Sequence, residues 1–240
     1  EVLPKPRVPV GGRPILWHIM KYYASYGHDE FVLCLGYKGQ VIKDFFMNYE
    51  AHTRDLTVSL GSSSGVEYHS KHEETTWRVT LAETGLRAMT GARIARIRRY
   101  VAGDDFMLTY GDGVGDVDLD QLLAFHKAHG KALTMTAVRP PGRFGEVVAD
   151  SGRVVEFNEK PQATGGRISG GFFVATPALF DYLEQSDDCV FEREPMRRLV
   201  ADHQMMVFEH DGFWQPMDTN REYELLNELY EKGNAPWIIW

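Results

Sequence analysis

The sequence has little cysteine, no long apolar run and no excess of positive charge. Only Cys34 and Cys189 are present, which excludes a disulfide framework and a zinc site built from cysteines. No apolar stretch is long enough to cross a bilayer and no charged and then apolar leader is found, so we expect a cytoplasmic protein without a membrane partner. With 26 basic and 34 acidic side chains and a net charge of −8, the chain lacks the positive field that attracts nucleic acid.

Common catalytic signatures are missing as well. The sequence contains no G-x-S-x-G motif, no G-x-G-x-x-G motif after an expected strand and no G-x-x-x-x-G-K-[ST] motif. Serine hydrolysis and hydride transfer therefore lack the residues on which they commonly depend.

The composition is that of a globular protein, with 240 residues, 43% apolar and 25% charged, and it suits one large α/β domain. Apolar residues at three- and four-residue steps predict a helix with one apolar face from Pro14 to Tyr26, after a turn at Gly11-Gly12. We expect further helices at 39–49, 91–101, 118–129, 177–184, 194–203 and 219–232. Strands are expected at 30–35, 55–60, 65–69, 78–82, 105–110, 132–138, 144–149, 153–157, 168–175 and 205–209.

This order of elements predicts an α/β architecture. Strands that alternate with helices in the first half indicate a mostly parallel sheet covered on both faces. The hairpins of the second half suggest an added mixed-sheet layer over one edge. Because no internal repeat or flexible linker interrupts the chain, we expect residues 1–240 to form a single domain.

Two aspartates stand out because each follows an apolar or rigid segment. The apolar run 106–110 ends in Gly111-Asp112-Gly113, which is how a buried strand delivers a carboxylate to the carboxyl edge of a sheet. Asp218 follows Pro216 and opens the last expected helix, where free N–H groups can orient it. Together the two carboxylates indicate a divalent-metal site. The structural alternative is a turn at Asp112 and a helix cap at Asp218.

Other residues could bind phosphate and sugar. Lys5 lies between two prolines, which bias it toward extended geometry and present its ammonium to a phosphate. In Glu159-Lys160-Pro161, the glutamate could bind sugar hydroxyls and the lysine a sugar phosphate, while Gly170-Gly171 would let a ligand approach the backbone. A solvated lysine, a surface salt pair and a β-bulge stay open as structural alternatives. His126 and His129 lack a third metal ligand, so we expect no metal there.

A set of motifs in this order resembles the sugar-1-phosphate nucleotidylyltransferases, and within them the enzymes that act on CTP and glucose 1-phosphate. The resemblance spans nearly the whole chain. Its motifs are Lys5-Pro6, residues 11–20 (GGRPILWHIM), Tyr110-Gly111-Asp112-Gly113, residues 140–145 (PPGRFG), Glu159-Lys160-Pro161, Gly170-Gly171-Phe172-Phe173 and residues 213–219 (FWQPMDT).

The resemblance implies a Rossmann-like three-layer α/β/α nucleotidyltransferase fold with a mixed, mostly parallel sheet and added β-hairpins. It also implies transfer of a cytidylyl group from CTP to α-D-glucose 1-phosphate, which gives CDP-glucose and pyrophosphate, by Mg²⁺-assisted in-line attack of the sugar phosphate. Family members often form homo-oligomers, hexamers among them. The apolar tail 235–240 would suit burial against a neighbouring subunit or on its own domain.

By position, the resemblance implies a role for particular residues. Lys5, Asp112 and Asp218 match the catalytic group, with the two aspartates as Mg²⁺ ligands. The nucleotide-contacting residues would be Lys5, Thr84, Gly85, Thr90, Arg93 and Gly111, and the sugar-phosphate side would be formed by Glu159, Lys160 and Gly171.

Two departures from the family pattern leave alternatives open. The family's first strand and its glycine-rich loop, which wraps the triphosphate, are not in the sequence, and Ser169 stands where Asn is usual. The alternatives are a related nucleotidylyltransferase with another base or sugar, and a catalytically silent module that binds sugar nucleotides.

Overall fold

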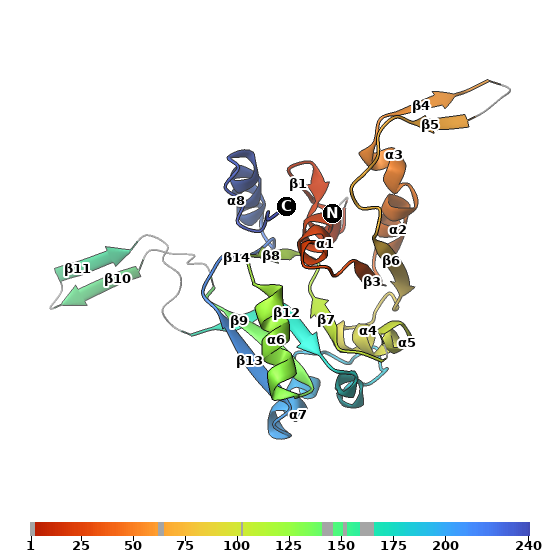
Figure 1. Ribbon diagram of the computed structural model, residues 1–240. Coiled ribbons are helices and arrows are strands. Elements are labelled where there is room, and N and C mark those ends of the chain that lie inside the picture. Colours follow the sequence, from red (N-terminus) through yellow and green to blue (C-terminus); the bar gives the residue numbers. More distant parts are fainter. Residues whose placement is uncertain (1–2, 62–64, 102, 141–145, 151–152, 159–165) are drawn as a thin grey trace.

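The largest sheet of the protein has 4 strands in the order β13-β9-β12-β7. The computed structural model describes residues 3–61, 65–101, 103–140, 146–150, 153–158 and 166–240 (Figure 1). Strand β13 pairs parallel with β9, whereas β12 pairs antiparallel with both β9 and β7. These strands are β7 (Phe106–Thr109), β9 (Leu133–Val138), β12 (Ile168–Ala175) and β13 (Met205–His210).

Strands β3 (Glu30–Leu35) and β6 (Arg78–Glu83) form a separate parallel pair. The architecture is therefore mixed α/β, as expected, but the ladders of β12 depart from mostly parallel pairing. A parallel return needs a crossover, usually a helix, and the described residues between β9 and β12 form only the hairpin β10 (Glu146–Asp150) and β11 (Arg153–Asn158). Strand β12 accordingly runs back along β9.

Most expected elements are present, but three of the expected helices differ. The helix expected at 39–49 ends at Met47, and a separate helix follows at Tyr49–Thr53. The basic helix expected at 91–101 is divided at Ile97, and the helix expected at 177–184 is a short 3-10 helix. The helices are η1 (Lys5–Arg7), α1 (Ile15–Ser25), α2 (Gly39–Met47), α3 (Tyr49–Thr53), α4 (Thr90–Arg96), α5 (Arg98–Val101), α6 (Leu119–His129), η2 (Pro177–Tyr182), α7 (Glu194–Ala201) and α8 (Asn220–Glu231). Within the parts of the chain that are described, none combines the length and apolarity needed for a membrane crossing.

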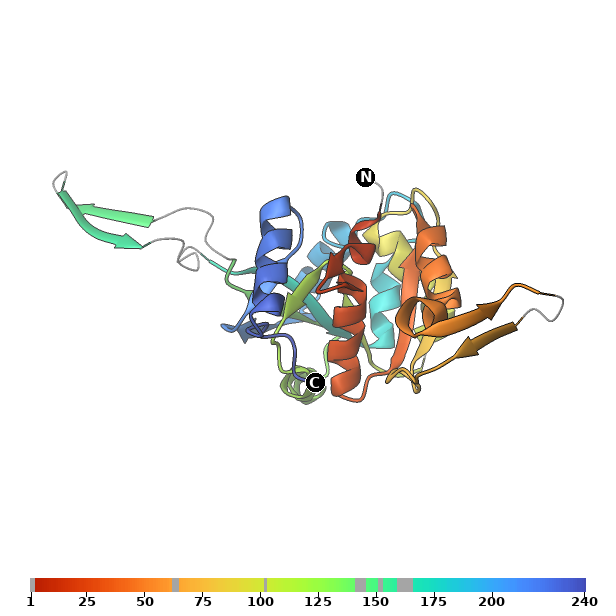
Figure 2. The ribbon, with the colours of Figure 1, turned by 90° about the horizontal axis from the view of Figure 1, so that it is seen from above.

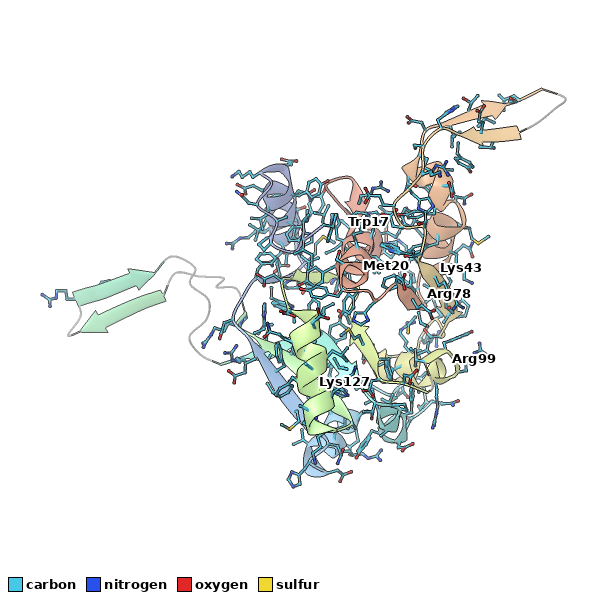
Figure 3. All side chains as sticks on the ribbon, viewed as in Figure 1. Trp17, Met20, Lys43, Arg78, Arg99 and Lys127 are labelled. Atoms are coloured by element: carbon cyan, nitrogen blue, oxygen red, sulfur yellow. The ribbon has the colours of Figure 1, made fainter. Side chains whose placement is uncertain are left out.

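Helix α1 lies at the centre of the core and is buried on two faces, not on one face as its periodicity predicts. Ile15 and Ile19 pack into a cluster with the last helix and the C-terminal segment, whereas Leu16 and Met20 pack against Leu35 of β3. In Figure 3, Trp17 and Met20 lie among neighbouring side chains, while Arg99 lies at the edge of the view; Arg99 and Lys127 are both exposed. Helix α6 packs against β9, β12 and β13 and covers one face of the main sheet.

His18 joins the two ends of the described chain. Its Nε2–H donates to the Val10 carbonyl (2.8 Å), and its Nδ1 accepts a hydrogen bond from Trp237 Nε1 (3.3 Å). Trp237 is 1% exposed and stacks on Phe213, so this part of the apolar tail packs on its own domain. Both ring nitrogens of His18 have partners only in the neutral form, and burial lowers the pKa of His18 to about 4.

We expect stability to fall with acid because of His18. The pKa of His18 is about 4 in the folded protein, against the ordinary histidine value of 6.5 in the unfolded chain, so the stabilisation is complete above pH 6.5 and is lost between pH 6.5 and 4. The loss from this group is about 3 kcal/mol. Urea unfolding of the wild type and of His18→Gln over this pH range measures this loss. The free energy of unfolding of the variant should change less steeply with pH than that of the wild type. Replacing the exposed His69 by Gln is the control, and an equal change of slope there would contradict the assignment.

The helix-end histidines His126 and His129 form hydrogen bonds within the protein. Thr134 is fully buried, and its Oγ1 lies 2.7 Å from His126 Nδ1 and 2.6 Å from His129 Nε2. The Lys131 N–H donates to His129 Nδ1, which leaves Nε2–H of the neutral ring to donate to Thr134.

Two hairpins project from the body (Figures 1 and 2), and the one in the second half of the chain does not form the expected layer over a sheet edge. One is β10–β11 and the other is β4 (Leu56–Ser59) with β5 (Gly65–Tyr68), and each forms its own 2-stranded sheet. Val58 and Val66 pair across the second hairpin and are 50% and 53% exposed. Val58 and Val66 are thus largely open to solvent, whereas the ring of Tyr68 at the base of the hairpin packs against the guanidinium of Arg54.

Candidate active site

A short two-stranded ladder brings the two aspartates together. Strand β8 (Gly113–Gly115) begins directly after Asp112 and pairs antiparallel with β14 (Trp214–Pro216), which ends just before Met217-Asp218. The Met217 N–H also donates to the Asp112 carbonyl (2.7 Å). Because Gly113 lies opposite Pro216, residues far apart in the sequence become neighbours at one end of this ladder.

Lys5 lies between the two carboxylates. Its Nζ is 2.7 Å from Asp218 Oδ1 and 3.9 Å from Asp112 Oδ2. Lys5 is not extended, as its proline neighbours suggested, but opens the 3-10 helix η1, where the missing N–H of Pro6 in the first turn is tolerated. Gly111 lies close to the segment that carries Lys5, since a Cβ on Gly111 would lie 3.3 Å from Pro6 Cγ.

The cap of α8 leaves the Asp218 carboxylate available for Lys5. Thr219 is the N-cap, and its hydroxyl accepts from the Glu222 N–H while Glu222 Oε2 accepts from the N–H groups of Asp218 and Thr219 (2.7 and 2.8 Å). The capping function is thus carried out by Thr219 and Glu222. Glu222 was not predicted, although the T-x-x-E pattern in the sequence could have identified it.

The electrostatics of this group fit a hard dication. The pKa of Asp112 is raised, chiefly by burial and also by the neighbouring Asp218 charge, while Lys5 opposes the shift. Carboxylates placed together in this way have oxygen donors suited to Mg²⁺, which usually takes one or two protein carboxylates and completes its shell with water and substrate phosphate. In the described ranges, no cluster of three or more Asp, Glu, His or Cys side chains forms a cage made of protein ligands alone.

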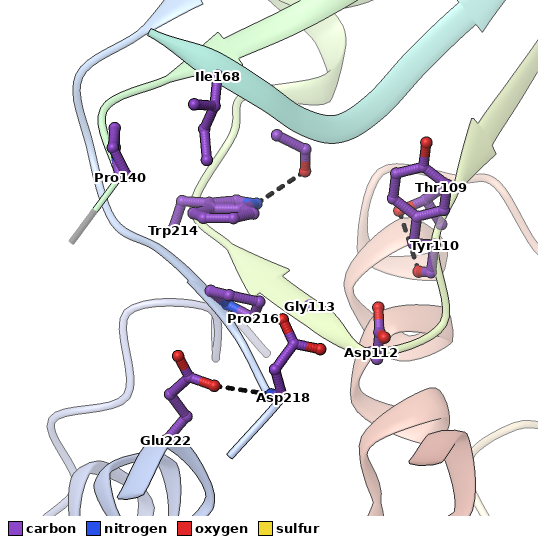
Figure 4. Close-up of a pocket in the computed structure, with 11 residues that line it drawn as sticks. Thr109, Tyr110, Asp112, Gly113, Pro140, Ile168, Trp214, Pro216, Asp218 and Glu222 are labelled. Carbon is purple, nitrogen blue, oxygen red and sulfur yellow. Dashed lines mark hydrogen bonds between the residues drawn. The ribbon is translucent and has the colours of Figure 1, made fainter. Parts of the chain in front are cut away.

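The two aspartates line a cavity of about 260 Å³ (Figure 4). The Trp214 indole N–H donates to the Gly170 carbonyl (2.7 Å) and fixes part of the wall. The cavity is lined by Thr109, Tyr110, Asp112, Gly113, Pro140, Ile168, Gly170, Trp214, Pro216, Asp218 and Glu222. Tyr110 and Trp214 stand within the motifs of the sequence, but no role was predicted for either.

Gly171 lies behind this wall. It has φ +73°, and a Cβ there would lie 2.5 Å from Tyr110 Cδ2, so only glycine lets the Tyr110 ring pack in this position. The pairing of β12 with β9 shifts register between Ser169 and Phe173, which is the bulge considered as the structural alternative. Glu159 and Lys160 lie outside the described residues.

Thr84, Gly85 and Arg93 form a second group at the carboxyl ends of β3 and β6. Thr84 is 1% exposed, donates its hydroxyl hydrogen to the Leu35 carbonyl (2.8 Å) and accepts from Arg93 Nη1 (2.9 Å). Arg96 donates to the Thr84 carbonyl (2.6 Å), and its guanidinium crowds Gly85. The Thr84 hydroxyl therefore has a structural partner, and none of these residues lines the cavity.

Thr90 begins helix α4 and is held by the segment that precedes α7. Its hydroxyl donates to Glu192 Oε2 (2.6 Å) and accepts from the Phe191 N–H (2.9 Å). The structure thus brings Lys5, Gly111, Asp112 and Asp218 together and places Thr84, Gly85, Thr90 and Arg93 at and around helix α4.

Comparison with known proteins identifies the family of the chain. The Nucleotidyl transferase family model matches residues 1–232. Glucose-1-phosphate cytidylyltransferase of Salmonella typhi is 49% identical over 240 residues, which are 100% of this chain and 92% of the relative. Probable glucose-1-phosphate cytidylyltransferase of Bacillus subtilis is 40% identical over 238 residues, 99% of this chain and 92% of the relative.

A solved structure has a similar fold. The crystal structure of HddC from Yersinia pseudotuberculosis complexed with GMP-PN superposes with a TM-score of 0.67 at 18% identity and covers 95% of this chain and 90% of that one. The expected Rossmann-like α/β fold class is thereby confirmed. With a family model matched along nearly its whole length, the chain belongs to the nucleotidyl transferase family.

Proposed function

We propose that the protein transfers a cytidylyl group from CTP to α-D-glucose 1-phosphate, giving CDP-glucose and pyrophosphate. The convergence of Lys5, Asp112 and Asp218 at one cavity carries the proposal, in a chain 49% identical over its full length to a protein named glucose-1-phosphate cytidylyltransferase. The choice of CTP and of glucose 1-phosphate follows the names of these relatives.

The proposed reaction needs groups that neutralise phosphate charge more than it needs a nucleophile from the protein. A sugar phosphate is already an anionic nucleophile, so the site must bring two anions into line and stabilise the departing pyrophosphate. Lys5 supplies one positive charge next to the reacting phosphates. Asp112 and Asp218 would hold Mg²⁺, which when bound neutralises phosphate charge and orients the triphosphate.

The remaining residues divide between the two substrates. Thr84, Gly85, Thr90, Arg93 and Gly111, together with Lys5, would contact the nucleotide. The hydroxyl, the backbone N–H and the carbonyl of Thr84 all have partners within the protein, so Thr84 would support the nucleotide side by holding Arg93 and Arg96 in place. Glu159, Lys160 and Gly171 would form the sugar-phosphate side, where Gly171 supports the cavity wall through Tyr110.

We also propose that residues 1–240 form one domain that works in the cytoplasm as a homo-oligomer. The packing of Trp237 against α1 supports a single domain, because it joins the last described segment to the core of the first half. The projecting hairpin β4–β5 supports self-association, since Val58, Leu60 and Val66 are exposed and would be covered by another subunit.

A substrate panel tests the function. The purified protein is incubated with glucose 1-phosphate and each of CTP, UTP, dTTP and GTP, with and without Mg²⁺, and pyrophosphate release is followed. We expect release with CTP and only when Mg²⁺ is present. Release with another nucleotide alone would identify a related nucleotidylyltransferase, and binding of CDP-glucose without release from any nucleotide would identify a silent binding module.

A further inference from the structure

Glu192 joins helix α4 to the end of strand β7. Its Oε2 accepts from the Thr90 hydroxyl (2.6 Å), and its Oε1 accepts a short hydrogen bond from the Tyr110 hydroxyl. The neighbouring Phe191 N–H donates to Thr90 Oγ1 (2.9 Å), so the first turn of α4 is bound twice to this segment. One carboxylate thus connects two residues that belong to different parts of the site.

Tyr110 is part of the cavity wall and lies two residues before Asp112. Its ring meets Phe173 edge-on (5.9 Å between centroids), and it also packs where Gly171 leaves room. Burial and the Glu192 hydrogen bond raise the pKa of Tyr110, which keeps the hydroxyl protonated and able to donate. The ring is held by Phe173 and Gly171, and its outer end is held by Glu192.

We propose that Glu192 is a positioning residue that fixes Tyr110 on the sugar-phosphate side of the cavity and ties this wall to Thr90. The inference rests on the proposed function, because that function places Thr90 on the nucleotide side. Nucleotide that orders the start of α4 then also orders Glu192 and, through it, Tyr110. Glucose 1-phosphate therefore binds better after CTP than before it.

Kinetics with both substrates varied test this inference. We expect Glu192→Ala to raise the KM for glucose 1-phosphate about tenfold, and Tyr110→Phe to raise it by a similar factor, because each removes the same charge-assisted hydrogen bond. The double variant should be no worse than Glu192→Ala alone, since the two changes act through one contact. The affinity for glucose 1-phosphate is also measured with and without a non-hydrolysable CTP analogue. The gain in affinity that the analogue gives should be smaller in Glu192→Ala and in Thr90→Val than in the wild type.

The Tyr182–Asp202 pair provides a matched control. Tyr182 donates to Asp202 Oδ2 (3.1 Å) at the surface, so Tyr182→Phe removes the same kind of hydrogen bond away from the cavity. Tyr182→Phe should keep the wild-type KM for glucose 1-phosphate. Thermal unfolding of Tyr182→Phe and Tyr110→Phe shows whether the two changes affect stability equally.

Two results would overturn the inference. One is a KM for glucose 1-phosphate in Glu192→Ala within about twofold of an active wild type, and the other is a double variant in which the separate effects multiply. A wild type that releases no pyrophosphate from any nucleotide would instead refute the proposed function, and with it the role of Glu192.

Discussion

The turnover number of Asp112→Asn is expected to be about 10²–10³-fold below that of the wild type, as for other dominant electrostatic groups in active sites. Asparagine keeps the shape of the side chain but removes one of the two carboxylate charges that face Lys5 and the proposed dication. The fold should be unaffected, because burial raises the pKa of Asp112 and its charge is already disfavoured in the folded protein. Pyrophosphate release at saturating substrate and Mg²⁺ measures the effect, and thermal unfolding checks the fold.

Asp120 provides the control for this substitution. It lies in the first turn of α6, is exposed and does not line the cavity, so Asp120→Asn makes the same chemical change at another site. Its turnover should equal that of the wild type. If Asp112→Asn kept more than about one tenth of the wild-type rate, the proposed role of Asp112 in holding Mg²⁺ would be wrong.

Lys5→Met is expected to lower the turnover number by about 10²-fold while reducing the Mg²⁺ concentration needed for half-maximal activity. The two effects have opposite signs because Lys5 would interact both with the substrate phosphate and with the two carboxylates. In the proposed reaction its ammonium would stabilise phosphate, but without substrate it pairs with the carboxylates that would bind the metal, at 2.7 Å from Asp218 and 3.9 Å from Asp112. Removing it leaves two adjacent carboxylates whose mutual repulsion a dication relieves.

Mg²⁺ titration of the rate separates these effects. Lys127, an exposed lysine on α6, gives the matched control Lys127→Met, which should change neither quantity (Figure 3). A Lys5→Met protein that needs more Mg²⁺ than the wild type would show that the ammonium and the metal do not share these carboxylates.

The sequence predicted the regular elements well where the periodicity was long. Helix α1 and strands β3, β7 and β9 lie where the apolar patterns placed them. The two buried faces of α1 were not predicted, because Leu16 and Met20 belong to the same apolar pattern as Ile15 and Ile19, and only the tertiary arrangement divides them between two clusters. The direction of β12 likewise depends on its connection to β9 and not on its own residues.

For the site, the sequence indicated Asp112 and Asp218 but could not show how they meet. The three-residue strands β8 and β14 that align them are too short to produce an alternating pattern. Glu192 was missed because its partners, Thr90 and Tyr110, are far from it in the sequence. Lys5 was expected in an extended segment, and only the structure shows it in a 3-10 turn.

The contacts of α1 and α8 have a consequence for synthesis on the ribosome. The Gly11 N–H donates to Asn227 Oδ1 (3.0 Å), and His18 pairs with Trp237, so the segment carrying Lys5 is anchored by residues that are translated 216 and 219 positions after their partners. A nascent chain that has not yet released Trp237 from the exit tunnel lacks the second of these anchors, and a chain that ends before Asp218 also lacks one of the two proposed metal ligands. We therefore expect the proposed site to form only after Asp218 and Trp237 have left the ribosome, and we expect polypeptides cut short before β14 to be inert instead of partly active.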